Sequence, residues 1–293
     1  VQNAKVNLGQ TNIEASGTTR QVQFQSTLAI GELGRLFRVA GGPAGTARLG
    51  GSASYTNANN YRVTANLDAR NVAFRQGTMQ ISGVSLDTSV TADPKRIDLG
   101  GLRLGALGGS LTGSASVENL DRFRLTGNLH NFDIDQLARA FLSKPLGYDG
   151  VVSGPLQAEG SIKNPAAVVA HAGLGIAPAS RGVPVSGKLN VDYNGRADTV
   201  MLAKSYLALP HTRIDLSGAL GQQIQVLVVS RDLADFRPVA GNLPVKLNAG
   251  GAATVTATAT GKLSAPRIAG DVLVTNFTAE GRPFTRLAAT FAA

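Results

Sequence analysis

The chain lacks cysteine and tryptophan, and aromatic residues make up only 5% of its 293 residues. Without cysteine it can form neither disulfide bridges nor cysteine-ligated metal sites, although a chain of this length can bury enough apolar surface without them. No segment approaches the ~20 consecutive apolar residues that a membrane-spanning helix needs. Hydrophobic residues still make up 43% of the chain, which argues against disorder and predicts an aliphatic interior of Val, Leu, Ala and Ile.

Motifs that carry chemistry are also missing. The three histidines, His130, His171 and His211, are far apart, and none has a second metal-type ligand at productive spacing. The Gly-rich stretches 41–45 and 105–109 lack the lysine and the strand-then-helix setting of a phosphate-binding loop. No nucleophile elbow or calcium loop is present. The sequence therefore predicts a protein that is not an enzyme and that uses no cofactor or metal.

The charge balance is strongly basic, with a formal net charge of +9 and a pI of about 10.2. Such a balance suggests anionic partners. The Lys and Arg residues are spread thinly and are not interleaved with aromatics, so we expect no nucleic-acid partner. A solvated basic face is the simpler interpretation. Contact with lipid phosphate by Arg62, Arg70, Arg124 or Arg213 is a hypothesis beside it.

Alternation of apolar and polar residues is the dominant pattern along the chain. In residues 61–68 the apolar side chains stand at odd positions and the polar ones at even positions. This period of two predicts strands with one apolar and one wet face. Turn signals such as Asp93-Pro94 and Asn194-Gly195 separate the segments. Helical spacing is confined to residues 133–142 and to shorter runs near 33–37 and 233–236.

The three helical spots recur with a period of about 100 residues, which indicates an internal repeat. The segments 160–165 and 261–266 match at the same period, each running from Gly to Pro. We expect one continuous β-groove over residues 1–293, truncated at both ends and cut from a longer protein. Its approximate repeat units are residues 1–32, 33–136, 137–232 and 233–293.

These patterns predict an all-β fold: a long, twisted, curved antiparallel sheet, built from ~100-residue repeats with short helices between strands. About 18 strands spaced ~4.8 Å apart would extend on the order of 80–90 Å. The sheet would curl into a taco-like hydrophobic groove that accepts acyl chains, because a bare apolar stripe of that size is not tolerated in water. The predicted groove-lining residues are Val63, Leu67, Leu86, Val90, Leu125, Leu129, Ile214, Leu216, Val226, Val228, Val272 and Val274.

Two other architectures deserve comparison. A structural or adhesive β-solenoid of a secreted or surface protein, with no lipid ligand, predicts coils of about 20 residues around a dry core. The longer period speaks against it. An outer-membrane barrel predicts aromatic girdles and a polar lumen, whereas the chain has no Trp and only 5 Tyr.

Residues 261–276 follow the pattern Gly-x-Leu-x-x-Pro-x-Ile-x-Gly-x-Val-x-x-x-Asn. Together with Val183-Pro-Val-Ser-Gly-Lys-Leu189 and the segment 209–213, they resemble the repeated signature of the TamB and AsmA-like envelope proteins, the translocation and assembly module family. The resemblance is good over residues 120–293 and looser before them. The matching segment that begins with residues 160–165 departs from this pattern at one position. Val169 stands there where the pattern has Gly270.

The resemblance implies a bridge-like protein of the bacterial periplasm that conducts phospholipid between the inner and outer membranes and supports outer-membrane assembly. It implies an outer-membrane barrel assembly protein as a partner. It also implies an anchor in the inner membrane, supplied by parts of the full-length protein that lie outside this chain.

Overall fold

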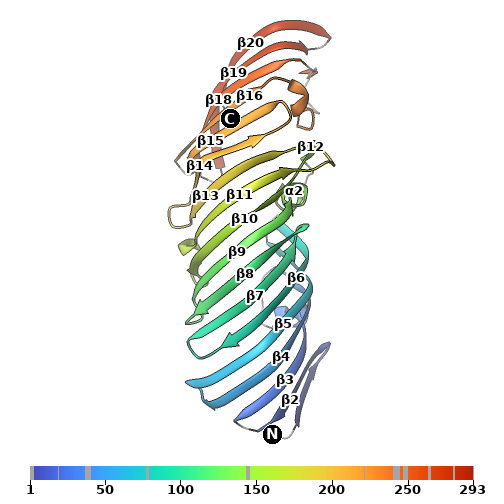
Figure 1. The fold of residues 1–293 in the computed structure, drawn as a ribbon, viewed down its shortest axis with the longest axis vertical. Helices are drawn as coiled ribbons and strands as arrows, with labels where there is room; N and C mark the ends of the chain where they lie inside the picture. Colours follow the sequence, from blue (N-terminus) through green and yellow to red (C-terminus); the bar gives the residue numbers. More distant parts are fainter. Residues whose placement is uncertain are drawn as a thin grey trace. The chain divides into compact units, whose positions relative to one another are not determined.

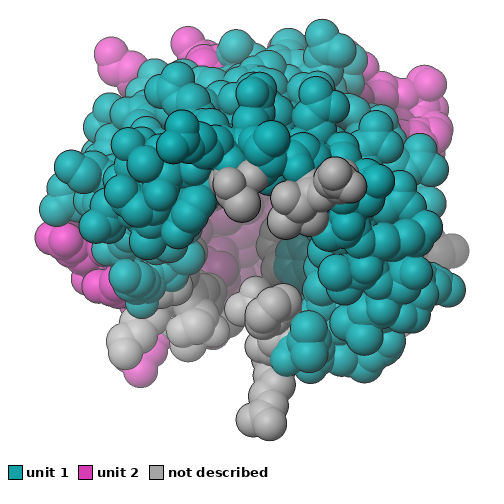
Figure 2. Space-filling model, turned by 90° about the horizontal axis from the view of Figure 1, so that it is seen from below, with its two compact units in different colours: residues 1–132, 136–144, 157–163 teal, residues 133–135, 145–156, 164–293 magenta. Residues whose placement is uncertain are grey.

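The structure is a computed structural model that describes residues 3–18, 20–36, 41–76, 79–142, 146–220, 222–239, 245–246, 250–262, 265–279 and 281–292. The chain divides into two compact units. Unit 1 comprises residues 1–132, 136–144 and 157–163, and unit 2 comprises residues 133–135, 145–156 and 164–293. Figure 2 shows the two units in different colours.

In unit 1 each strand pairs antiparallel with the next strand in the chain, and two short helices interrupt the succession of strands (Figure 1). The C-terminal part of β10, from residue 157 onward, also belongs to this unit. The elements are β1 (Asn3–Leu8), β2 (Thr11–Gly17), β3 (Gln21–Ala29), α1 (Ile30–Leu36), β4 (Ala44–Asn57), β5 (Asn60–Gln76), β6 (Met79–Ala92), β7 (Arg96–Ala106), β8 (Gly109–Glu118), β9 (Arg122–Asp133), α2 (Ile134–Leu142) and β10 (Tyr148–Ser161).

Unit 2 repeats the same meander of antiparallel neighbours. The two shortest strands depart from it: β12 pairs in parallel with the start of β10, and β17 pairs with β19. The neighbours in the meander are therefore β11 with β13 and β16 with β18. The elements are η1 (Pro165–Ala167), β11 (Val169–Pro178), β12 (Val183–Pro184), β13 (Ser186–Asn194), β14 (Thr199–Ala208), β15 (Thr212–Leu220), β16 (Gln223–Ser230), η2 (Leu233–Phe236), β17 (Val245–Lys246), β18 (Ala252–Lys262), β19 (Ala265–Ala279) and β20 (Arg282–Ala292).

The predicted fold class, a long curved antiparallel sheet with short helices, is confirmed, and the taco-like groove stays a prediction. The protein is all-β, with 75% of residues in strands and 9% in helices, and its antiparallel sheet is curved and open rather than closed. Short helices lie at all three sites where helical spacing predicted them, as α1, α2 and the 3₁₀ turn η2. The division into four ~100-residue repeat units stays a prediction.

Strand register places the apolar residues of unit 1 on one face. Ala65 on β5 lies opposite Gly51 on β4 and Val90 on β6, and the row continues through Leu99 to Ala115. The charged residues of β4 to β8, and those that begin β9, fall at the alternate positions and so on the opposite face. They are Arg48, Arg62, Asp68, Arg70, Arg75, Asp87, Arg96, Asp98, Arg103, Glu118, Arg122 and Arg124.

Two adjacent glycines on β4 reveal which face is the inner side of the bend. A methyl group added at Gly51, on the apolar face, would overlap Thr64 O and lie 2.7 Å from Ala65 Cβ. At Gly50, on the polar face, the nearest atom would be Gln25 Cγ at 3.8 Å. Gly270 on the apolar face of unit 2 is crowded in the same way, against Ala257 Cβ at 2.8 Å. Neighbouring strands therefore crowd together on the apolar face, as they do on the concave side of a curved sheet.

The apolar face of unit 1 has no second layer of strands among the described residues. No described side chain of the protein is less than 2% exposed, and several of the buried apolar residues on this face are alanines, such as Ala47, Ala65 and Ala69. Viewed from below, the described residues of unit 1 curve around a hollow (Figure 2). The sheet is thus stabilised mainly by its ladders and by cross-strand pairs on one face.

A carboxylate near the start of a helix fastens a hairpin turn in each unit. Glu32 on α1 accepts hydrogen bonds from Gln10 N at 2.8 Å and from Thr11 N and Oγ1 at 3.1 and 3.0 Å. In unit 2, Asp235 on η2 accepts from His211 N at 2.8 Å, and its Oδ2 lies 2.8 Å from Thr212 Oγ1. Both threonines are about 4% exposed or less. The short helices therefore fix the ends of the strands around them.

Candidate functional site

The structure brings together the six lining residues predicted in unit 1. Val63 and Leu67 on β5 lie opposite apolar or small residues of β4 and β6, and Leu86 pairs with Ala69 and Leu104. Leu125 and Leu129 on β9 pair with Ala115 and Leu111. With Val90, these residues share one face, and each is half-buried rather than buried. They remain partly open to solvent because no second layer of strands covers them.

The six residues predicted in unit 2 also share a face. Ile214 pairs with Val228, and Leu216 pairs with Val226, across β15 and β16. Val228 then pairs with Val255, which pairs with Val272 on β19, while Val274 lies opposite Ala253. All six predicted side chains are half-buried. Each unit thus has one apolar face with partly exposed aliphatic side chains.

Hydroxyl side chains such as Thr88 and Ser205 interrupt these faces, and alternation alone did not single them out. Thr88 lies opposite Leu67, and Ser205 lies opposite Leu216; they are 6% and 2% exposed. Thr88 Oγ1 lies 3.0 Å from Gly100 O, and Ser205 Oγ accepts from Asn190 N at 3.0 Å. Both occur where the register shifts at a bulge. Because the backbone satisfies these hydroxyls, the faces stay apolar in character.

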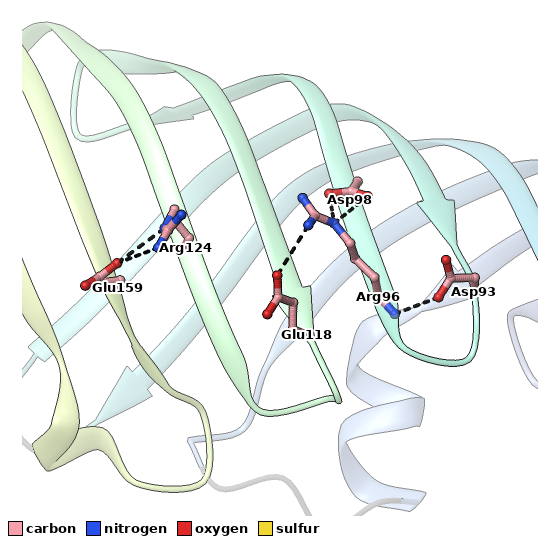
Figure 3. Close-up of polar contacts among 6 residues, drawn as sticks. All are labelled: Asp93, Arg96, Asp98, Glu118, Arg124 and Glu159. Carbon is pink, nitrogen blue, oxygen red and sulfur yellow. Dashed lines mark hydrogen bonds and ion pairs between the residues drawn. The ribbon is translucent and has the colours of Figure 1, made fainter.

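The arginines proposed for headgroup contact lie on the polar face. Arg70 donates to both carboxylate oxygens of Asp87 at 3.1 and 3.0 Å. Arg124 donates to Glu159 at 3.3 and 3.2 Å (Figure 3). In unit 2, Arg213 pairs with Asp215 at 2.8 Å and stacks over Tyr206. Three of the four are therefore engaged on the side opposite the apolar residues.

The fourth candidate, Arg62, also falls on the polar face, opposite Ser54 on β4. The polar face carries further ion pairs, such as Arg96 with Asp98 and with Glu118 (Figure 3). Its half-exposed carboxylates include Asp87, whose pKa is lowered chiefly by the hydrogen bond from Arg70. Such exposed pairs contribute little stability each. They keep this face hydrated and leave the opposite face uncharged.

The histidines take part in local polar contacts. His130 Nε2 lies 3.0 Å from Thr112 Oγ1, His171 Nδ1 lies 2.5 Å from Asp192 Oδ1, and His211 Nδ1 lies 3.5 Å from Asp235 Oδ1. Within the part of the chain that the structure describes, no group of three or more His, Cys, Asp or Glu residues is placed to hold a metal ion.

One buried charge cluster in unit 2 was missed by sequence reasoning. Asp133 and Asp149 are 4% and 2% exposed. Arg181 reaches both carboxylates, forming an ion pair with Asp133 and approaching Asp149 Oδ2 to 3.6 Å, and its pKa is raised mainly by the hydrogen bond to Asp133. Nothing in the local sequence marks Arg181 as the partner of Asp133 or Asp149. The cluster fastens the loop before β12 to the start of β10, since Arg181 N also donates to Asp149 Oδ2 at 2.6 Å.

No helix among the described residues is long and apolar enough to cross a bilayer. Comparisons of the chain with models of protein families, with curated proteins and with solved structures find no match. The resemblance of residues 261–276 to the TamB and AsmA-like proteins therefore stays a prediction.

Proposed function

We propose that the apolar faces of the two units bind the acyl chains of lipids and let them move along the sheet. One observation carries the proposal: each unit has a face of half-buried aliphatic side chains that carries no charged residue at the paired positions described above. An apolar surface of this extent exposed to water favours association with an apolar partner.

The energetics suit an acyl chain. Each CH₂ group removed from water contributes about 0.8 kcal/mol. The nine strands β1 to β9 of unit 1 give a face that extends for roughly 40 Å in the direction across the strands, at ~4.8 Å per strand. Alanine, valine and leucine side chains dominate it, with glycines such as Gly51, Gly113 and Gly127 between them. A shallow aliphatic surface of this kind removes the cost of exposing a chain to water and offers no deep pocket that would hold it in place.

The proposal extends to the setting that the sequence resemblance implies. The lipid is a phospholipid, the compartment is the bacterial periplasm, and the direction of the sheet is the path between the inner and outer membranes. An outer-membrane barrel assembly protein would be the partner, and an inner-membrane anchor would lie in the full-length protein. These parts of the proposal rest on the motif in residues 261–276 and on the open, curved antiparallel sheet.

Native mass spectrometry of the protein purified from a bacterial periplasm in gentle detergent tests the proposal. We expect several phospholipids per chain. A Leu216→Asp substitution places a charge on the apolar face and should reduce the bound lipid, whereas Ser217→Asp places the same charge on the opposite face and should not. Wild-type protein that carries no lipid and takes up none from added phospholipid would contradict the proposal.

A further inference from the structure

The hairpin turns along one side of unit 1 form a continuous rim. They join β2 to β3, β4 to β5, β6 to β7 and β8 to β9, and the end of β10 lies on the same side. Backbone hydrogen bonds tie neighbouring turns together, from Asn119 N to Lys95 O at 2.7 Å and from Ile162 N to Asp121 O at 2.8 Å. Because the strands curve across the concave face, their ends border its opening. We call this set of turns the turn rim.

The turn rim carries cations without protein partners. Within the described residues, the side chains of Arg20, Lys95, Arg122 and Lys163 make no hydrogen bond or ion pair, and all four residues are exposed. They occur in the turns or directly beside them. On the polar face, by contrast, Arg70 and Arg124 are held by carboxylates. Arg48, Arg62 and Arg103 on the polar face also make no hydrogen bond or ion pair within the described residues. The four rim cations differ from them in position, because they stand at the border of the apolar face.

The acidic residues of the same turns are occupied by the protein itself. Asp93 Oδ1 accepts from Lys95 N and Arg96 N, both at 2.8 Å, and these bonds lower the pKa of Asp93 (Figure 3). Asp121 Oδ1 lies 2.5 Å from Ser161 Oγ and accepts from Lys163 N, and the bond with Ser161 is the main cause that lowers its pKa. Both carboxylates are thus used to build the turns. Arg122 and Lys163 are close enough to lower the pKa of Asp121 further through their charge.

Large apolar side chains are exposed on the same rim. Leu120, between β8 and β9, is 66% exposed, Ile162 at the end of β10 is 55% exposed, and Tyr55 at the end of β4 is 51% exposed. Exposed aliphatic and tyrosine side chains beside cations are typical of surfaces that meet the boundary between headgroup and acyl chain. The rim therefore joins a cationic strip to the apolar face.

We infer that the turn rim binds the phosphate group of an anionic amphiphile while its acyl chain lies on the apolar face of unit 1. The inference rests on the proposed function and deepens it: it selects phosphate-bearing lipids over neutral lipids with the same chain. It also replaces Arg62, Arg70, Arg124 and Arg213 with the rim residues Lys95, Arg122 and Lys163 as the residues that contact the headgroup.

Two probes with the same acyl chain separate the headgroup from the chain: a lysophosphatidic acid and the corresponding monoacylglycerol. We expect the wild-type protein to bind the phosphate-bearing probe more tightly, with an advantage that shrinks as salt is raised. The triple substitution of Lys95, Arg122 and Lys163 to Gln should weaken binding of this probe roughly five- to tenfold. It should leave binding of the monoacylglycerol unchanged.

Arg48→Gln/Arg103→Gln, a variant with two exposed cations removed from the polar face, is the control and should bind both probes as the wild type does. Glycerol 3-phosphate should not compete, because the site requires an attached chain. Equal binding of the two probes by the wild type, or an unchanged preference in the triple variant, would overturn the inference. So would a triple variant that binds the dispersed probes normally and loses only its affinity for anionic vesicles. Failure of the wild type to bind either probe would instead refute the proposed function.

Discussion

Shortening a leucine on the apolar face should cost far less stability than shortening a residue in a covered core. Leu125 is half-buried and lies opposite Ala115. Full burial of a leucine side chain stabilises a protein by about 1.5–3 kcal/mol, so the half-buried side chain of Leu125 contributes about half of that free energy. Because the space left by Leu125→Ala stays open to solvent, no cavity is formed. We expect the substitution to lower the free energy of unfolding by about 1 kcal/mol.

Phe277 provides the matched comparison from a covered site. It is 6% exposed, clusters with Leu233 and Ala253, and stacks on Phe284 with ring centroids 5.2 Å apart. Removal of a buried phenylalanine side chain costs about 3–5 kcal/mol. We therefore expect Phe277→Ala to destabilise unit 2 at least twice as much as Leu125→Ala destabilises unit 1.

Urea unfolding of lipid-free protein, followed by circular dichroism because the chain has no tryptophan, measures both changes. Thr126→Ala on the opposite face is the control for Leu125 and should be nearly neutral. A loss of about 3 kcal/mol or more in Leu125→Ala would mean that the apolar face is packed against a second layer. The reasoning from a single-layered sheet would then be wrong.

Three further predictions concern two hydrogen-bonded turns of the sheet and one strand residue with a positive φ. Thr212→Val leaves Asp235 without one of its partners and should cost about 1–3 kcal/mol in thermal or urea unfolding; a neutral effect would contradict it. The pKa of Glu32 is lowered, chiefly by Gln10 N, so its stabilising effect is present above the ordinary Glu pKa of about 4.3 and is lost as pH falls through the lowered value. The difference in melting temperature between the wild type and Glu32→Gln should therefore shrink from pH 7 to pH 3, and a constant difference would refute this. Asn276 has a φ of 53°; Asn276→Val should cost about 1–2 kcal/mol, and Asn276→Gly should be tolerated.

The sequence predicted the strands and their faces because alternation is a local property that the fold preserves. In β5 the period of two runs unbroken from Tyr61 to Ala69, and the twelve predicted lining residues all fall on one face of their unit. The pattern could not place the bulges. Asn71, with a φ of 52°, shifts the register between β5 and β6, and a single extra residue of this kind is invisible to a count of alternating residues.

Long-range polar contacts could not be predicted from the sequence for a different reason: they join residues that are far apart in the chain. Arg181 meets Asp133 and Asp149 only after the loop before β12 folds back on β10. The contacts of Glu32 and Asp235 with hairpin turns likewise join residues more than 20 positions apart. The rim cations could be found in the sequence as turn residues. The sequence could not show that these cations lack partners. That depends on the carboxylates of the same turns, Asp93 and Asp121, which accept hydrogen bonds from backbone N–H groups in the folded chain.

Photo-crosslinking at adjacent positions of one strand tests the central claim most directly. A photoreactive amino acid at Leu67 faces the apolar side, and the same amino acid at Asn66 faces the polar side. In cells, our account predicts crosslinks to phospholipid from position 67 and none above background from position 66, with the same contrast between Leu216 and Ser217. Equal lipid labelling at both members of each pair, or labelling at neither, would contradict the proposal that lipid lies on the apolar face.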